Sequence, residues 1–191
     1  MAAVTCVGLS QALEAAVREA LAAVALPVVV ASAGPQPRGA FLDCSQEEWT
    51  ATVAAAKAAF QAAQGAAAGW EAGGAEGRIV FVVPTSTVRV VPGDALAAAA
   101  GGFLTTIGQV GAIELGGKGI TVNTVVHGWL EGEPEALVEG IPAGRLAKPA
   151  DVAGAVAFLA SPAAAYINGA VLTVDGGAWI TKTGGGSPLL P

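Results

Sequence analysis

Apolar positions along the chain follow two different periods, and the two kinds of segment alternate. Residues 28–31 and residues 79–83 are unbroken runs of mostly β-branched apolar side chains. Such short runs are typical of strands that are buried on both faces of a parallel sheet. From Leu13 to Val24, apolar residues instead recur every three or four positions, which is the period of a helix with one buried face. The pattern therefore predicts strands that alternate with helices.

The same reasoning extends to the whole chain. We expect strands at residues 4–7, 28–31, 78–83, 120–126 and 170–174, and helices that begin near residues 10, 45, 94 and 149. This alternation indicates an α/β fold with a Rossmann-like, largely parallel sheet flanked by helices. Residues 1–180 are enough for a single domain with its own core. Residues 181–191 are expected to form a flexible tail.

The start of the second helix carries a specific local signal. Ser45 is followed three residues later by Glu48, the spacing of a capping box. The Ser45 hydroxyl can accept a hydrogen bond from the Glu48 amide, and the Glu48 carboxylate can accept one from the Ser45 amide. The signal predicts a helix that begins at residue 46, and we expect it to end near residue 64.

Composition narrows the classes of partner. The chain has a formal net charge of −6 and no Lys/Arg cluster, so it lacks the charge pattern that nucleic-acid binding needs. Its apolar stretches are interrupted before the roughly 20 residues that a membrane span requires. One histidine and two cysteines without CxxC spacing argue against a structural metal. Only 13% of residues are charged, which favours subunit interfaces over bare surface. We expect an oligomeric cytoplasmic protein.

Several motifs stand in the order and spacing of a known family. They are Gly-Ile-Thr-Val-Asn at 119–123, Gly-Arg-Leu at 144–146, Lys-Pro-Ala-Asp-Val at 148–152 and Val-Asp-Gly-Gly at 174–177. Residues 31–34, Ala-Ser-Ala-Gly, are similar to that family's Asn-Asn-Ala-Gly segment. In these motifs the chain resembles a short-chain dehydrogenase/reductase of the 3-oxoacyl-carrier-protein reductase type. The resemblance implies a Rossmann-like fold and NAD(P)-dependent relatives.

The chain departs from the family where the cofactor binds. The family's Thr-Gly-x-x-x-Gly-x-Gly motif lies on the first strand–helix turn, where glycines let the pyrophosphate approach backbone amides. No such motif occurs here. We therefore expect the first cofactor-binding βαβ region to be missing at the N-terminus, so that the chain begins near the family's third strand. NAD(P) is expected in a catalytic partner and not in this chain.

The missing region has a consequence for strand pairing. In the family order the third strand lies two strands away from the fourth. If the intervening pair is lost, residues 4–7 can pair directly beside residues 28–31. A right-handed crossover is expected to join them.

The catalytic positions implied by the resemblance also lack side chains that can transfer a proton. The family uses a tyrosine, a lysine four residues later, a serine and an asparagine. Aligned through residues 114–123, these positions hold Ala97, Gly101, Pro84 and Ala55. Neither alanine nor glycine can donate or accept a proton from its side chain. We expect no hydride transfer by this chain alone.

Two polar residues follow expected strands and are weaker candidates for chemistry. Ser86 lies just after Pro84 and is either a replacement for the serine or a turn-forming hydroxyl. His127 follows residues 120–126, at the strand end where ligands bind in α/β sheets. Its alternative role is a polar contact within the loop.

Small residues point to a subunit interface. Gly101, Gly102 and Gly108 fall within the expected helix 94–115, where each costs about 1 kcal/mol relative to alanine. In relatives the corresponding helix packs against its counterpart in another subunit, and glycine permits close approach. Trp179, on the C-terminal segment, is expected at an interface as well.

Three functions remain open at this point. The first is a noncatalytic subunit that pairs with a full-length relative acting on a hydroxyacyl, ketoacyl or related alcohol or ketone substrate. The second is a non-redox enzyme, lyase-like or dehalogenase-like, with a pocket around Ser86 and His127. The third is a ligand-binding homodimer on the same scaffold.

Overall fold

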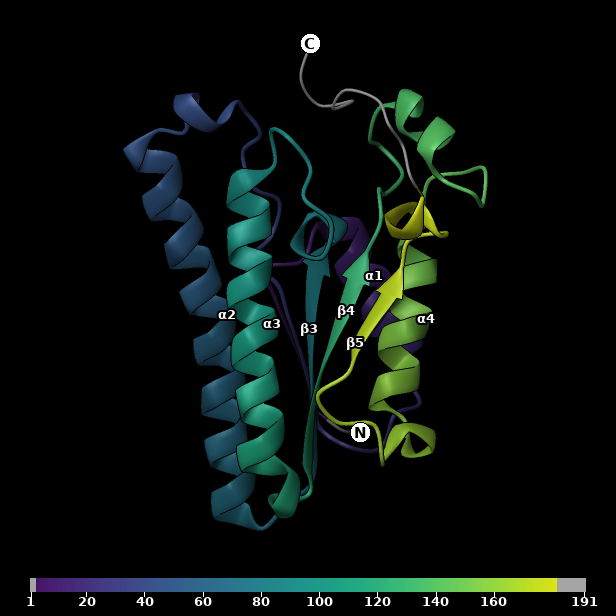
Figure 1. Ribbon diagram of the computed structural model, residues 1–191. Coiled ribbons are helices and arrows are strands. Elements are labelled where there is room, and N and C mark those ends of the chain that lie inside the picture. The colour runs from purple at the N-terminus through teal and green to yellow at the C-terminus, as the bar shows by residue number, and fades with distance from the viewer. Residues whose placement is uncertain (1–2, 182–191) are drawn as a thin grey trace.

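The computed structural model describes residues 3–181 and arranges them as one sheet between two layers of helices (Figure 1). The strands are β1 (Val4–Val7), β2 (Val28–Ala31), β3 (Gly77–Pro84), β4 (Ile120–His127) and β5 (Val171–Val174). The long helices are α1 (Gln11–Ala20), α2 (Gln46–Gly73), α3 (Ala95–Leu115) and α4 (Pro149–Ala160). The predicted Rossmann-like α/β fold is confirmed. Apart from Thr181, the predicted tail lies outside the described residues.

The sheet is parallel throughout, and its spatial order is the order of the chain, β1-β2-β3-β4-β5. Val4 pairs with Val28 and Val7 with Ala31, so the predicted pairing of residues 4–7 with residues 28–31 is confirmed. The long strands β3 and β4 pair over their full length and form the centre of the sheet. Their carboxyl ends, Pro84 and His127, lie directly opposite each other.

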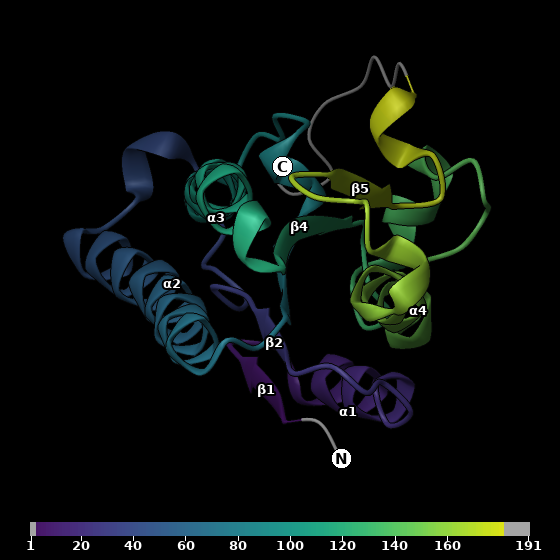
Figure 2. The ribbon, with the colours of Figure 1, turned by 90° about the horizontal axis from the view of Figure 1, so that it is seen from below.

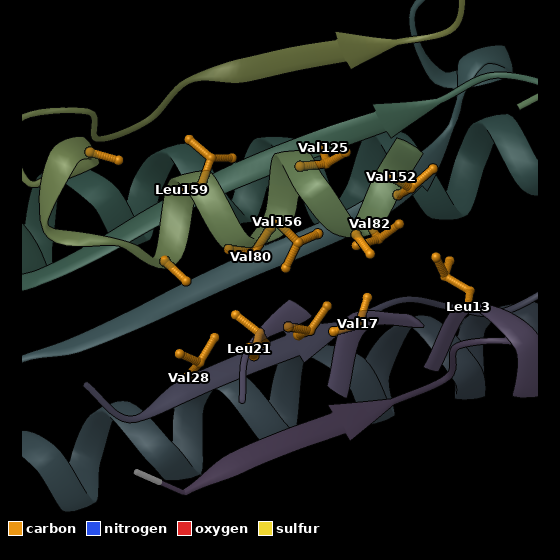
Figure 3. Packing of buried hydrophobic residues seen from close by; sticks show 14 residues of the cluster. Leu13, Val17, Leu21, Val28, Val80, Val82, Val125, Val152, Val156 and Leu159 are labelled. Atoms are coloured by element: carbon orange, nitrogen blue, oxygen red, sulfur yellow. The ribbon is translucent and has the colours of Figure 1, made fainter. Parts of the chain in front are cut away.

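Successive strand residues point to opposite faces, and each face has its own apolar core. Helices α1 and α4 cover one face, where Val28, Val80 and Val82 contact their apolar side chains (Figure 3). Helices α2 and α3 cover the other face, where Ile79 and Phe81 belong to a second cluster. Figure 2 shows the two layers along the strand direction.

The connections between strands do not all have the same hand. All four step across the sheet in one direction, yet α1 and α4 lie on one face and α2 and α3 on the other. Connections on opposite faces must therefore be of opposite hand, and those through α2 and α3 are right-handed (Figures 1 and 2). The right-handed crossover predicted between residues 4–7 and 28–31 is wrong, because α1 buries Leu13, Val17 and Leu21 on the face that α4 covers.

Helix α2 begins as predicted and ends later. The Ser45 hydroxyl accepts from the Glu48 amide at 3.1 Å, and the Glu48 carboxylate accepts from the Ser45 amide at 2.9 Å. The predicted end near residue 64 is wrong, because the helix continues beyond Gly65 and packs Ala67 and Trp70 in the core on this face of the sheet. The helix stops at Gly74, whose φ of 64° is left-handed.

One apolar stretch is longer than expected. Within residues 3–181, the helical segment Ala95–Lys118 is long and apolar enough to cross a membrane, by length and composition alone. The expectation that every apolar stretch is interrupted too early is therefore wrong here, since its glycines stay helical. In this structure one side of the segment faces the sheet, where Leu104 packs with Phe81 and Val122.

Candidate functional site

A pocket of about 350 Å³ opens at the carboxyl ends of the strands. This edge is where open α/β sheets bind their ligands. The turns after β1 and β2, the ends of β3 and β4, the first turn of α3 and the loop after β4 all contribute to its walls. The lining residues are Gly8, Leu9, Ser10, Leu13, Ser32, Gly34, Pro35, Gln36, Arg38, Pro84, Asp94, Ala97, His127, Leu130 and Glu133.

Two of the predicted catalytic positions meet in this pocket. Pro84 ends β3, Ala97 lies in the first turn of α3, and both are lining residues. Gly101 is one turn further along α3 and does not line the pocket, because Thr87 stands against it: a Cβ at Gly101 would collide with the Thr87 hydroxyl. Ala55, the predicted asparagine position, lies on α2 outside the lining.

The two weaker candidates lie in different places. His127 lines the pocket, whereas Ser86 is buried in the short helix η2 (Thr85–Thr87) and is absent from the lining. The hypothesis of a non-redox site needs Ser86 and His127 in one pocket, and the Ser86 hydroxyl is not in the pocket that His127 lines. Within residues 3–181, the Ser86 Oγ has no hydrogen-bond partner, and neither do the hydroxyls of Thr85 and Thr87.

His127 is held in its neutral form. Its Nδ1 lies 2.8 Å from the carbonyl oxygen of Gly128. Because a carbonyl only accepts, Nδ1 carries the proton and Nε2 is the acceptor. Burial lowers the pKa of His127 from its usual value, although the Gly128 carbonyl and the carboxylates of Glu133 and Asp94 act in the opposite direction. A neutral imidazole thus lines the pocket.

Arg38 ties the two sides of the pocket together. Its guanidinium donates to both carboxylate oxygens of Glu133, at 2.6 and 3.1 Å, and lies over the ring of Trp129 at 5.2 Å. Its Nε is 3.5 Å from the Asp94 Oδ1. The hydrogen bond to Glu133 is the main reason why the pKa of Arg38 is raised above its usual value. The turn after β2 is thereby joined to the loop after β4.

The turn after β1 is a part of the site that the sequence analysis missed. In the Rossmann strand order 3-2-1-4, the strand beside the fourth is the first, and β1 takes that place beside β2. The turn after β1 thus stands where the family binds pyrophosphate, although the chain was expected to begin near the third strand. Counted from Gly8, the family's glycine spacing falls on Ala12 and Glu14. The sequence offered one signal for this turn, which is Gly8 directly after the apolar run at residues 4–7.

These residues do not fit a dinucleotide pyrophosphate. A Cβ at Gly8 would collide with the Ser32 carbonyl, so this turn packs directly on the next one. The Ser10 hydroxyl already caps α1 by accepting from the Leu13 amide at 3.4 Å. The one guanidinium of the lining, that of Arg38, gives its short hydrogen bonds to Glu133 and lies 3.5 Å from the Asp94 carboxylate. A doubly charged anion would meet negative charge where it needs positive charge.

The predicted interface glycines divide into two groups. Gly108 is buried, and a Cβ there would touch Phe81 at 3.0 Å, while Gly101 faces Thr87. Packing inside the chain is thus a reason for glycine at both positions, and their place at a subunit interface stays a prediction. Gly102 faces open space, and Trp179 is 46% exposed, so these two residues can reach a partner.

Helices α2 and α3 also present apolar side chains outward. Ile113 is 84% exposed, and Phe103 and Val110 on the same helix are close to half exposed. Trp49 and Val53 on α2 are exposed to a similar degree. We call these five residues the α2–α3 apolar face. Among residues 3–181, no group of three or more His, Cys, Asp or Glu side chains is placed to hold a metal ion.

A parallel sheet between two helical layers, with a pocket at its carboxyl edge, defines a Rossmann-like α/β protein. Residues 5–178 match the family model described as enoyl-(acyl carrier protein) reductase. This match covers most of the chain, and the chain belongs to the short-chain dehydrogenase/reductase family.

Individual relatives agree with this assignment. The chain is 39% identical to a 3-oxoacyl-[acyl-carrier-protein] reductase of Vibrio cholerae over 114 residues, which are 55% of this chain and 47% of that protein. It is 33% identical to an L-rhamnose 1-dehydrogenase (NAD(P)(+)) of Azotobacter vinelandii over 169 residues, 80% of this chain and 64% of that protein. The chain thus spans about half to two thirds of these relatives.

The fold comparison agrees as well. The crystal structure of a putative 2-deoxy-D-gluconate 3-dehydrogenase from Agrobacterium tumefaciens with bound NADP is similar, with a TM-score of 0.76 and 31% identity. The similarity covers 81% of this chain and 68% of that one.

Proposed function

We propose that this chain is a noncatalytic member of the short-chain dehydrogenase/reductase family and acts as a subunit beside a catalytically complete relative. One observation carries the proposal: Pro84 and Ala97, at the positions expected for the catalytic serine and tyrosine, line the same pocket. The pocket of the fold is kept, while both side chains lack a proton to exchange. His127 remains in the lining as a neutral imidazole.

The apolar faces support the subunit role. The α2–α3 apolar face and the exposed Trp179 present large side chains to solvent in the single chain. Exposed apolar clusters of this kind mark interaction surfaces. The proposed partner is a full-length family member that binds NAD(P) and acts on a hydroxyacyl, ketoacyl or related substrate, by analogy with the 3-oxoacyl-[acyl-carrier-protein] reductase of Vibrio cholerae. The complex is proposed to be cytoplasmic.

The test is to purify the tagged chain gently from its native host and to identify co-eluting proteins by mass spectrometry. We expect a full-length dehydrogenase in stoichiometric amount, within a complex of defined mass. A clean homo-oligomer, with no dehydrogenase at any step, would overturn the subunit role and favour ligand binding by a homodimer.

The noncatalytic half of the proposal has its own measurement. The purified chain alone, mixed with NADPH and a 3-oxoacyl thioester, is expected to give no loss of NADPH absorbance. The double variant Ala97→Tyr/Gly101→Lys is expected to stay inactive, because Thr87 occupies the space in front of residue 101. Turnover by the unmodified chain would contradict the proposal.

A further inference from the structure

The pocket at the sheet edge has a charge pattern that the proposed function does not use. Its lining holds two carboxylates, Asp94 and Glu133, against one guanidinium, Arg38. Glu133 takes both of the short hydrogen bonds that Arg38 makes in the pocket. One negative charge is therefore left over in a partly enclosed space, where an uncompensated charge is costly.

Asp94 is the carboxylate that lacks a close partner. Its side chain is 2% exposed, and its Oδ1 makes no hydrogen bond within residues 3–181. The distance of 3.5 Å to Arg38 is longer than the roughly 2.7–2.9 Å of a charge-assisted hydrogen bond. Asp94 also stands at the N-cap of α3 without capping it, since its side chain accepts no hydrogen bond from the helix. A buried acceptor in this state can accept a hydrogen bond from a donor outside the chain.

The rest of the lining completes a description of the ligand. The acceptor Nε2 of the neutral His127 adds a second site for an N–H donor. Leu9, Leu13 and Leu130 supply an apolar wall. The volume of about 350 Å³ suits a small molecule and lies near the lower end of known ligand pockets.

We propose that this pocket binds a small aliphatic amine, whose ammonium group donates to Asp94 and whose hydrocarbon part contacts the leucine wall. An ammonium group carries three N–H donors and one positive charge, which match the unpaired acceptors and the excess negative charge. This site goes beyond the proposed function, since a noncatalytic subunit can assemble without any ligand.

Three probes of equal length separate charge from size: n-butylamine, 1-butanol and butyrate. Binding to the full chain is measured by isothermal titration calorimetry at constant ionic strength, with thermal unfolding as a second readout. We expect n-butylamine to bind most tightly and butyrate most weakly. Equal or tighter binding of butyrate would overturn the proposal. Tighter binding of NADP⁺ than of n-butylamine would also overturn the proposal, because the pocket would then be a dinucleotide site.

The Asp94→Asn variant tests the residue. It is expected to weaken n-butylamine binding by at least about tenfold and to leave 1-butanol binding unchanged, because only the charge-assisted hydrogen bond is lost. The matched control is Glu131→Gln, an exposed carboxylate on the same loop as Glu133, which is expected to bind like the unmodified chain. Unchanged n-butylamine binding by the Asp94→Asn variant would show that Asp94 does not bind the ammonium group.

A second variant covers the case in which Asp94→Asn fails to fold, which circular dichroism would reveal. Glu133→Gln removes the other carboxylate, so that Arg38 is free to pair with Asp94. We then expect the preference for n-butylamine over butyrate to disappear. A preserved preference in this variant would contradict the proposal on its own.

Discussion

His127 stays neutral because burial of its imidazole outweighs two nearby carboxylates. Desolvation is the largest effect on its pKa and lowers it, while the Gly128 carbonyl, Glu133 and Asp94 raise it by less. The same balance leaves Nε2 as an acceptor in the pocket. At the scale of one residue, the neutral ring of His127 therefore offers the pocket one hydrogen-bond acceptor, Nε2, and no positive charge.

This neutral histidine predicts how stability depends on pH. The folded-state pKa lies below the usual value of 6.5, so the unfolded chain binds the proton first and stability falls as the pH drops below that value. We expect the free energy of unfolding to decrease between pH 7.5 and 5.5, with a slope of at most about 1.4 kcal/mol per pH unit. Urea unfolding at several pH values measures it.

The control is His127→Asn, which can keep a donor toward the Gly128 carbonyl and does not titrate. His127 is the single histidine of the chain, so the variant should show a flatter profile in this window. Asp151 cannot account for the slope, because the hydrogen bond from Arg145 lowers its pKa from 3.8, well below pH 5.5. Equal slopes in both proteins would show that His127 is not the group responsible.

Part of the site could be predicted at this scale and part could not. Pro84 and Ala97 were placed by motif spacing, and the strand ends then brought them into one pocket. The pair Arg38–Glu133 joins residues 95 positions apart in the chain, and no period or motif links them. In the sequence, Asp94 marked only the expected start of a helix, and only the fold places it in the pocket lining.

At the scale of single elements, helix α3 contains neighbouring glycines in opposite environments. A Cβ at Gly101 would collide with Thr87, whereas one at Gly102 would meet open space. Gly101→Ala is expected to reduce the free energy of unfolding by about 1–3 kcal/mol through overpacking. Gly102→Ala is expected to raise it by about 0.5–1 kcal/mol through helix propensity. Denaturant titration of both variants provides the comparison.

A third variant identifies the cause. If Thr87 is the obstacle, adding Thr87→Ala to Gly101→Ala should recover part of the lost stability. Two alanine variants with the same stability would mean that the close packing between α3 and η2 is not what requires glycine at residue 101.

The elements themselves followed from local patterns. Unbroken β-branched runs marked β2 and β3, and the Ser45–Glu48 pair marked the start of α2. The end of α2 and the hand of the first connection did not follow. Both depend on contacts between elements: the packing of Ala67 and Trp70 of α2 in the core beside the sheet, and the burial of α1 against α4. Such contacts cannot be predicted from the local sequence.

At the scale of the whole molecule, the α2–α3 apolar face sets the expected assembly. Ile113→Glu places a charge in this face at a side chain that is 84% exposed, so the folded single chain should tolerate it. We expect the variant to unfold at the same denaturant concentration as the unmodified chain and to lose the complex or self-association. Analytical ultracentrifugation and native mass spectrometry measure this.

The control for that experiment is a substitution of equal charge elsewhere. Tyr166→Glu alters a fully exposed side chain outside the α2–α3 apolar face. It should leave assembly through that face intact. If both variants or neither variant dissociated, the face would not be the interface.

The packing of α1 on α4 also bears on how the chain is made. The strands pair in chain order, so the sheet can grow one strand at a time during synthesis. The apolar stripe of Leu13, Val17 and Leu21 can pack on β2 early, but its contacts with α4 form only after that helix has been made. At about 5–20 residues per second, the roughly 130 residues between the two helices delay these contacts by about 6 to 26 seconds. Among the four long helices described, α1 is thus made first but reaches its full packing only when α4 is complete, so its apolar stripe is a candidate site for a chaperone during synthesis.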